Sequence, residues 1–293
     1  MSPLAQSIYK TLAFFDVQDF PLTLLEIRNY LIVSSDLPES ILPMEVRWTI
    51  ETEMAGKVGY HEGVYFLAGR ENLVALRQGR YRISLVRFRK VRKILYFLRF
   101  FPYLRAVAIS GSQALLNSDE KSDIDLLVIT KKNRIWLARA LISFYLQILG
   151  QRRHGPYIEN RFCLNHYICE GQEIRQDQNL YTAIEYASLL PILGEAELHA
   201  FWLKNIWLGK FLKGPTMQAK SSFMDNRFSP LQRFLEIVLD FTIAPILNAL
   251  FGTFQKHRIK LSEHVLVSDE ELSFHPGSRG QKVLSQFQKR LFN

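Results

Sequence analysis

Two aspartates and a Gly-Ser pair lie close together in one stretch of the sequence, residues 106–130, AVAISGSQALLNSDEKSDIDLLVIT. Asp123 and Asp125 are separated by one residue within an apolar run that is typical of a buried strand. Alternate side chains of a strand share a face, so the two carboxylates are expected side by side. Adjacent carboxylates repel each other unless a cation lies between them. Mg²⁺ prefers oxygen ligands and commonly binds one or two carboxylates together with substrate phosphates.

Gly111 and Ser112 follow an apolar strand predicted for Leu104–Ser110 and precede a short helix-prone segment. Free backbone N–H groups and the helix dipole at such a turn favour phosphate. A phosphate-binding turn followed by ten residues and then a pair of carboxylates therefore indicates nucleotide chemistry. The alternative is a structural turn before two exposed strand aspartates. We favour the functional site, because paired aspartates in an Ile/Leu/Val strand are difficult to explain by packing.

Gly111-Ser112, the ten-residue gap and Asp123-Ile124-Asp125 between apolar residues resemble the signature of the DNA polymerase β-like nucleotidyltransferase superfamily. The resemblance covers about 25 of the 293 residues. It implies a mixed sheet in which the Gly-Ser turn holds the triphosphate of an NTP and the two aspartates bind Mg²⁺ (or Mn²⁺). It also implies transfer of a nucleoside monophosphate to an acceptor hydroxyl with release of pyrophosphate. The acceptor stays open, because a small molecule, a protein and an RNA end need the same metal centre.

A later strand, Arg161–Cys169, is expected to pair beside the aspartate strand. In the superfamily that the motif resembles, such a strand usually supplies a third carboxylate, which helps to bind metal and can activate the acceptor. The corresponding position here holds Asn165, whose neutral amide can ligate a hard cation but cannot act as a general base. Replacement acids would be Glu159, Glu170 or Glu185. Without one, the chain would bind nucleotide with slow turnover or none.

Further candidate residues surround this motif. Lys121, Arg105 or the basic turn Arg152-Arg153 would add positive charge near the leaving pyrophosphate. Tyr181 and Glu185 share a helix face at i and i+4, and related nucleotidyltransferases close the acceptor site with helices that follow the sheet, so both are expected to line the cleft.

Two strand residues are expected to have structural roles. His166 would point to the face opposite Asn165 as a packed histidine. Cys163 and Cys169, the only cysteines, would lie about 20 Å apart in an extended strand, which is too far for a disulfide. We expect two buried thiols in a reducing compartment.

The net charge of +9 is distributed unevenly. No acid occurs between residues 72 and 118, whereas residues 77–105 contain ten lysines and arginines. Such a cluster favours polyanions, so nucleic acid is an expected partner through this segment. A solvated helix face explains the cluster equally well.

The predicted elements give an α+β chain in four parts. Residues 1–72 have three helices (Ile8–Val17, one from Thr23, Pro43–Ala55) and a hairpin at Lys57–Leu67, and resemble a winged-helix domain. A basic linking helix, a small mixed-sheet nucleotidyltransferase core and a C-terminal helical region are expected at 73–102, 103–175 and 176–293. Because the second and third helices are not basic, we favour a packing role for the first part over DNA reading. The rival is a winged-helix regulator that senses a nucleotide.

The expected location is the cytoplasm. The first ten residues lack the apolar core of a signal peptide. The longest apolar stretch, Phe234–Phe251, contains Glu236, Asp240 and Pro245, so no membrane span is expected. The acids also argue against membrane-surface contact, although a buried or partner-facing helix is compatible with them.

Overall fold

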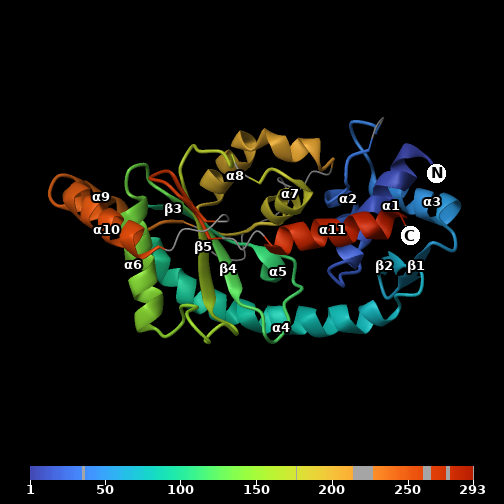
Figure 1. Ribbon diagram of the computed structural model, residues 1–293, viewed down its shortest axis with the longest axis horizontal. Coiled ribbons are helices and arrows are strands. Elements are labelled where there is room, and N and C mark those ends of the chain that lie inside the picture. Colours follow the sequence, from blue (N-terminus) through green and yellow to red (C-terminus); the bar gives the residue numbers. More distant parts are fainter. Residues whose placement is uncertain (35–36, 176, 214–226, 260–264, 275–277, 293) are drawn as a thin grey trace.

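A computed structural model of the chain describes residues 1–34, 37–175, 177–213, 227–259, 265–274 and 278–292. It has mixed α and β structure around a six-stranded mixed sheet, with helices on both faces (Figure 1). The general α+β class expected from the sequence is therefore confirmed. The predicted linker at 214–226 lies outside the described residues.

The first part of the chain contains the predicted helices and hairpin. They are α1 (Pro3–Asp16), α2 (Leu24–Asn29), α3 (Pro43–Glu53), β1 (Val58–His61) and β2 (Val64–Leu67). The predicted capping box begins α2: Thr23 Oγ1 accepts the Glu26 N–H at 3.3 Å, and Glu26 Oε2 accepts the Thr23 N–H at 2.7 Å. The hairpin turn at Glu62-Gly63 has two positive φ angles, 48° and 83°, as a tight antiparallel connection requires.

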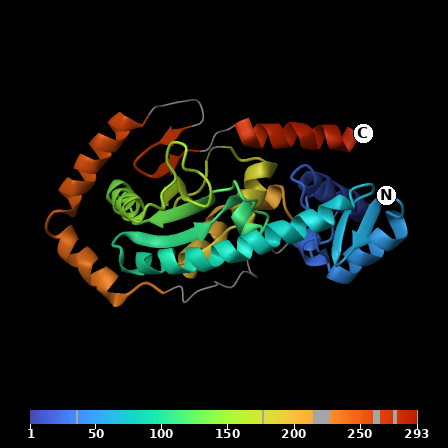
Figure 2. The same cartoon turned by 90° about the horizontal axis from the view of Figure 1, so that it is seen from below.

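Helix α4 (Asn72–Leu95) and the 3₁₀ turn η1 (Tyr96–Phe100) form the linking helix predicted for residues 73–102. It runs along one edge of the molecule from the N-terminal helices to the sheet (Figure 2). The spacing of Leu85, Val91, Leu95 and Leu98 predicts one apolar helix face. Val91, Leu95 and Leu98 are buried accordingly, but Leu85 is 43% exposed, so the prediction was wrong for that residue.

The sheet has the strand order β6-β3-β4-β5-β8-β7. Its strands are β3 (Leu104–Ile109), β4 (Ile124–Thr130), β5 (Phe162–Cys169), β6 (Leu190–Leu193), β7 (Leu266–Val267) and β8 (Glu271–Ser273). Strands β4 and β5 are neighbours, as predicted, and run parallel, whereas β3 is antiparallel to β4. The short connection between β3 and β4 holds α5 (Gly111–Ala114). The two halves of the motif therefore lie on adjacent strands.

The part of the chain after residue 176 is less helical than expected, because it supplies β6, β7 and β8. The predicted helix 180–190 ends at Ala187, and Pro191 lies in β6. Proline is tolerated there because β6 is an edge strand. A four-residue apolar strand cannot be distinguished from a helix end by periodicity alone, which explains the error.

The remaining helices cover both faces of the sheet. They are α6 (Ile135–Ile148), α7 (Leu180–Ala187), α8 (Glu195–Lys204), η2 (Ile206–Lys210), α9 (Pro230–Asp240), α10 (Ala244–Arg258) and α11 (Ser278–Phe292). One core joins α7, α8 and one sheet face to the N-terminal helices, and the other joins α4, η1 and α6 to the opposite face. The predicted helix 196–212 divides into α8 and η2, and its aromatics Phe201, Trp202 and Trp207 are core residues, as expected.

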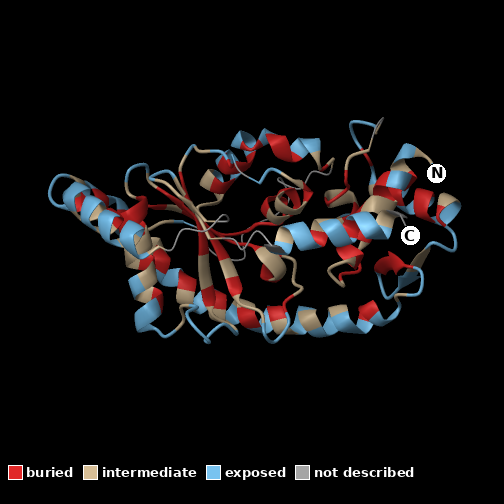
Figure 3. Cartoon of the chain, in the orientation of Figure 1, coloured by how far each residue is buried: buried red, intermediate tan, exposed pale blue. Residues whose placement is uncertain are grey.

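Helices α9 and α10 form a bent pair at one end of the molecule, with much of their surface exposed (Figure 3). Ser229 caps α9, and the break between the helices lies beside Pro245, in the first turn of α10. In the described part of the chain, no single helix is long and apolar enough to cross a membrane. The α9–α10 pair meets the length and composition criteria only when combined, and it is bent by 86°.

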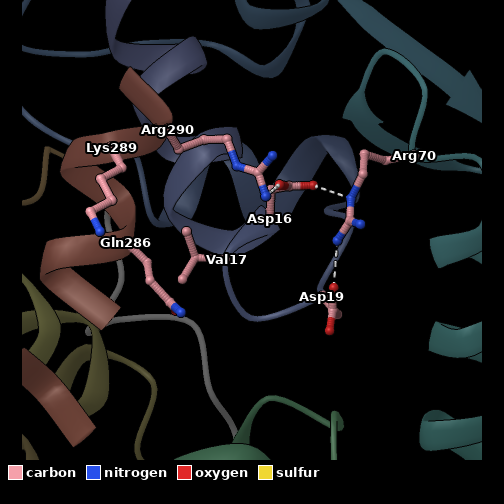
Figure 4. Close-up of a pocket in the computed structure, with 7 residues that line it drawn as sticks. All are labelled: Asp16, Val17, Asp19, Arg70, Gln286, Lys289 and Arg290. Carbon is pink, nitrogen blue, oxygen red and sulfur yellow. Dashed lines mark hydrogen bonds and ion pairs between the residues drawn. The ribbon is translucent and has the colours of Figure 1, made fainter. Parts of the chain in front are cut away.

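Helix α11 returns to the N-terminal helices. Phe287 packs on Phe14 with ring centroids 5.5 Å apart. Beside this contact, a cavity of about 430 Å³ separates α11 from α1 and the loop that follows it. Asp16 lies there between two arginines: it accepts from Arg70 at 2.9 Å and forms an ion pair with Arg290 at 2.8 Å (Figure 4). The last helix is thus tied to the first by both apolar and ionic contacts.

Candidate metal and nucleotide site

Asp123 and Asp125 lie at the start of β4. Asp123 directly precedes the strand, Asp125 is its second residue, and both side chains are half-buried. Because Asp125 pairs with Cys163 across the parallel β4–β5 ladder, the thiol joins them. One ligand atom from each of the three residues lies within 4.8 Å of the others. The two carboxylates thus lie together, as predicted; the proximity of Cys163 was not predicted.

Gly111 forms the turn that approaches these carboxylates. Its φ is +63°, and a Cβ atom there would lie 2.9 Å from Asp125 Oδ2. The neighbouring Ser110 N–H donates to the Asp125 carbonyl at 3.0 Å, which fixes the turn against the strand. Only glycine combines this left-handed backbone with so close an approach. The Gly-Ser turn therefore lies directly beside the aspartate pair.

Asn165 occupies the position at which a third carboxylate was expected. Its Nδ2 donates to Asp125 Oδ1 at 2.8 Å. Its Oδ1 is buried and has no hydrogen-bond partner among the described residues. An unsatisfied buried acceptor is costly, and a cation or a ligand donor would satisfy it. The oxygen-rich set formed by this amide and the two carboxylates suits a hard divalent cation.

Arg153 from the basic turn reaches the same carboxylates. Its Nη1 lies 2.5 Å from Asp123 Oδ2 and 3.4 Å from Cys163 Sγ. Burial alone lowers the pKa of Arg153, but Cys163 and Asp123 raise it above its ordinary value. Burial raises the pKa of the Cys163 thiol, and the Asp125 and Asp123 charges raise it further. Cys163 is therefore a neutral thiol at neutral pH, and Arg153 supplies the positive charge.

The loop between the Gly-Ser turn and Asp123 is attached to α4. Ser84 of that helix accepts the Ser118 N–H at 3.2 Å with its hydroxyl, and its carbonyl accepts from the Gln113 side chain at 3.0 Å. Arg87 is buried and donates to the Glu120 carbonyl at 2.9 Å. Burial lowers the pKa of Arg87, whereas the nearby acids Asp119, Asp123 and Glu159 oppose that shift. Helix α4 therefore positions the loop that carries the aspartates.

Several basic residues of the segment 77–105 have structural partners. Arg77 pairs with Glu26 at 2.9 Å, Arg80 donates to Asn117 Oδ1 at 3.2 Å, and Lys90 donates to the Asn160 carbonyl. Burial and the Arg161 and Arg87 charges lower the pKa of Lys90. Part of the basic cluster is thus used within the fold.

Two predicted candidates, Arg105 and Glu170, lie away from the aspartates. Arg105 is near the opposite end of β3, where it pairs with Glu236 at 2.9 Å and with Glu170 at 3.1 Å. The predictions that Arg105 supplies charge to the site and that Glu170 replaces the third acid were therefore wrong. A residue at the far end of a strand is remote from its other end, whatever its charge. Glu159 is exposed and contributes to the field at Arg87 instead.

The remaining candidates lie in or beside the site. Lys121 is exposed in the loop that leads to Asp123, where its backbone N–H donates to Asp119 Oδ1 at 3.0 Å. Helix α7 carries Tyr181 and the half-buried Glu185. Burial raises the pKa of Tyr181, and the Glu185 and Asp125 charges raise it further. The face of α7 with Tyr181 and Glu185 is therefore within electrostatic reach of Asp125.

His166 is a packed histidine, as predicted. It is 2% exposed, and its ring nitrogens lie 3.1 Å from Glu271 Oε1 and 3.3 Å from the Tyr186 hydroxyl. Asp125 pairs with Cys163 and Leu127 pairs with His166, so β5 contains one residue more than β4 between these two pairs. This bulge breaks the alternation on which the prediction of opposite faces for Asn165 and His166 relied.

Comparisons with protein-family models, with curated proteins and with solved structures gave no match to this chain.

Proposed function

We propose that the chain is a metal-dependent nucleotidyltransferase, which transfers a nucleoside monophosphate from an NTP to an acceptor hydroxyl and releases pyrophosphate. The convergence of Asp123 and Asp125 with the left-handed turn at Gly111 is the observation that carries this proposal. Paired carboxylates favour a bound cation, and the turn offers backbone N–H groups to phosphate. A triphosphate bound to a divalent cation satisfies both groups.

Each residue has a defined role in this proposal. Asp123 and Asp125 would hold Mg²⁺ or Mn²⁺, with Asn165 Oδ1 as a neutral oxygen beside them. When bound, such an ion polarises phosphate oxygens and offsets the charge that develops during transfer. Ser112 and the Gly111 backbone would contact the β- and γ-phosphates. Arg153, now paired with Asp123, would turn to the triphosphate once a metal neutralises that carboxylate.

A catalytically weak or inactive nucleotide-binding protein is the second candidate, and Asn165 favours it. Its amide donates to Asp125 and cannot take a proton from an acceptor hydroxyl. Glu185 is the predicted replacement acid that we propose for this task, because it shares the α7 face with Tyr181, which the Asp125 charge reaches. Turnover therefore depends on whether an acceptor bound near α7 reaches Glu185.

Metal-dependent nucleotide binding is the first test. Binding of each NTP is measured by calorimetry with Mn²⁺ and with EDTA. We expect binding in Mn²⁺ only, and a loss of at least tenfold in affinity in Asp123→Asn and Asp125→Asn, since either change removes a charged ligand. Glu120→Gln, an exposed acid in the same loop, is the matched control and should bind normally. Equal binding by all four proteins would exclude this site.

Turnover is tested separately. The chain is incubated with labelled NTPs, Mg²⁺ and a cell extract, and the labelled products are resolved by mass. A product that requires Asp125 would support the transferase and reveal the acceptor class. Binding without any product would favour the second candidate. A shift of duplex DNA that needs residues 1–72 would instead support the regulator interpretation.

A further inference from the structure

Helices α9 and α10 expose a large apolar face at the end of the molecule away from the N-terminal helices (Figure 2). Six large apolar side chains of this pair are each more than half exposed: Phe234, Ile237, Phe241, Ile246, Leu250 and Phe254. Phe241, in the turn between the helices, is 88% exposed. Contiguous apolar surface of this kind marks an interaction site.

The two acids of the stretch do not reach this face. Glu236 is buried and accepts from Arg105 at 2.9 Å and from the Tyr103 N–H at 2.6 Å. Asp240 pairs with Lys131 at 2.6 Å and with Arg134 at 2.9 Å. These acids were the reason that membrane contact was not expected from the sequence, and in the fold both point inward, away from the exposed face. Within α9, α10 and the turn between them, no acid is exposed.

Positive charges flank the apolar turn on both helices. Arg233 is exposed on α9, and Arg258 is exposed at the end of α10; Lys256 is also exposed but pairs with Asp269 at 2.8 Å. At 1.5 Å per residue and with the 86° bend bisected by a surface normal, Arg233 lies about 7 Å behind the end of α9 and Arg258 about 14 Å behind the start of α10. This separation places the cations near lipid headgroups when the apolar turn is inserted.

We propose that α9 and α10 dock the protein on an anionic lipid surface, with the turn around Phe241 inserted and Arg233 and Arg258 at the headgroups. An apolar face with cations and without exposed acids complements a negatively charged bilayer. The bend between α9 and α10 makes the exposed face convex. A fluid lipid surface can adapt to a convex face, whereas a protein partner would need a matching groove.

The inner side of the pair carries polar contacts to the protein, which suit a position on a membrane surface and not across the bilayer. Asn248 Oδ1 accepts the Leu137 N–H at 3.1 Å, and Gln255 donates to the Trp136 carbonyl at 3.0 Å. Together with the ion pairs of Glu236 and Asp240, these polar contacts fix one side of each helix on the protein. Each helix therefore has a polar side that binds the protein and an apolar side that is exposed. Helices that lie in a membrane interface have this arrangement.

Sedimentation of the full chain with lipid vesicles tests this inference. We expect binding to phosphatidylcholine vesicles that contain about one third phosphatidylserine, weaker binding at high salt, and little binding to phosphatidylcholine alone. Phe241→Glu should weaken binding about tenfold or more, because it places a charge in the inserted turn. Ile206→Glu is the matched control: this residue is 81% exposed on η2 and should leave binding unchanged.

Other results would overturn the proposal. If no vesicle binds and light scattering detects an oligomer that Phe241→Glu dissociates, a second copy of the chain covers this face. If the protein resists extraction from vesicles by alkaline carbonate, the pair spans the bilayer instead of lying on it. Equal losses in Phe241→Glu and Ile206→Glu would make the binding non-specific. None of these outcomes depends on nucleotide, so the proposed transferase activity is tested independently.

Discussion

At the scale of single residues, the candidate site depends on how closely Gly111 and Asp125 approach. A side chain at Gly111 would meet the carboxylate that a metal is proposed to bind, in a backbone conformation that other residues rarely adopt. Asn165 completes this arrangement by holding Asp125 with its amide nitrogen, while its own oxygen stays unsatisfied. The neutral residues Gly111 and Asn165 thus orient the charged side chain of Asp125.

Gly111→Ala should destabilise the fold by about 1–2 kcal/mol and abolish metal-dependent nucleotide binding, because the methyl group displaces Asp125. Gly63→Ala is the control that separates backbone strain from the clash with Asp125. Gly63 has a φ of +83°, but no atom lies within 4 Å of the added methyl group. This variant should lose similar stability in chemical denaturation and keep full binding in calorimetry. Normal nucleotide binding by Gly111→Ala would contradict the proposed phosphate turn.

Asn165→Asp would place a third carboxylate beside Asp123 and Asp125. Without metal, the added repulsion should lower the melting temperature by several degrees, equivalent to about 1–2 kcal/mol. With saturating Mn²⁺ the loss should be reversed, since the cation binds the folded state more tightly. The measurement is thermal unfolding of both proteins with and without metal. A metal-independent loss would show that Asn165 lies outside the cation site.

At the scale of elements, α4 holds the loop between the two halves of the motif. Ser84 bonds the start and the middle of that loop, through Gln113 and Ser118, while Arg87 binds the Glu120 carbonyl nearer to Asp123. A helix that is basic in sequence is thus partly a structural support. Its exposed residues, such as Arg82 and Arg89, stay available for the predicted contact with nucleic acid.

Ser84→Ala removes the acceptor for the buried Ser118 N–H and should cost about 1–2 kcal/mol in chemical denaturation. Since the loop leads to Asp123, we also expect nucleotide affinity in Mn²⁺ to fall several-fold, although Ser84 lies outside the proposed ligand set. Arg82→Ala, an exposed change on the same helix, should leave both quantities unchanged. Loss of stability with unaltered affinity would separate α4 from the site.

Helix α9 is fixed in part by Asp240. Burial alone raises its pKa, but the bonds from Lys131 and Arg134 lower it below its ordinary value. The unfolded chain then binds more protons, so this pair stabilises the protein above the unfolded pKa of about 3.9, and the contribution is lost as pH falls through the lower folded value. Asp240→Asn should therefore flatten the acid limb of the curve of unfolding free energy against pH. An unchanged limb would mean that the bridges are not formed in solution.

At the scale of the whole molecule, the two chain ends meet. Phe287 of α11 is buried on Phe14 of α1, and α11 also contacts α7, the helix that carries Tyr181 and Glu185 (Figure 1). One apolar core accordingly runs from the N-terminal helices to the sheet. The domain boundaries at residues 72, 102 and 175 stay a prediction, and this core contains residues from both sides of each boundary.

Phe287→Ala should destabilise the protein by about 3 kcal/mol, because it leaves a cavity beside Phe14. Gln288→Ala, one residue away and exposed, should have little effect. Chemical denaturation followed by two probes, tryptophan fluorescence and far-UV circular dichroism, measures both variants. If the N-terminal helices unfolded separately from the sheet in the wild type, the shared core would not couple them.

Local sequence determined what neighbouring residues can determine: the capping box at Thr23, the hairpin turn at Gly63, the core face near Leu95 and the pairing of Asp123 with Asp125. These features follow from helix and strand periods and from backbone preferences. The tertiary structure determined which residues that are distant in the sequence lie together in space. It brought Arg153 and Cys163 to the aspartates, removed Arg105 from them, inserted β6 at a sheet edge and turned Glu236 inward. Such outcomes depend on strand order, a bulge and burial, for which spacing along the chain carries no signal.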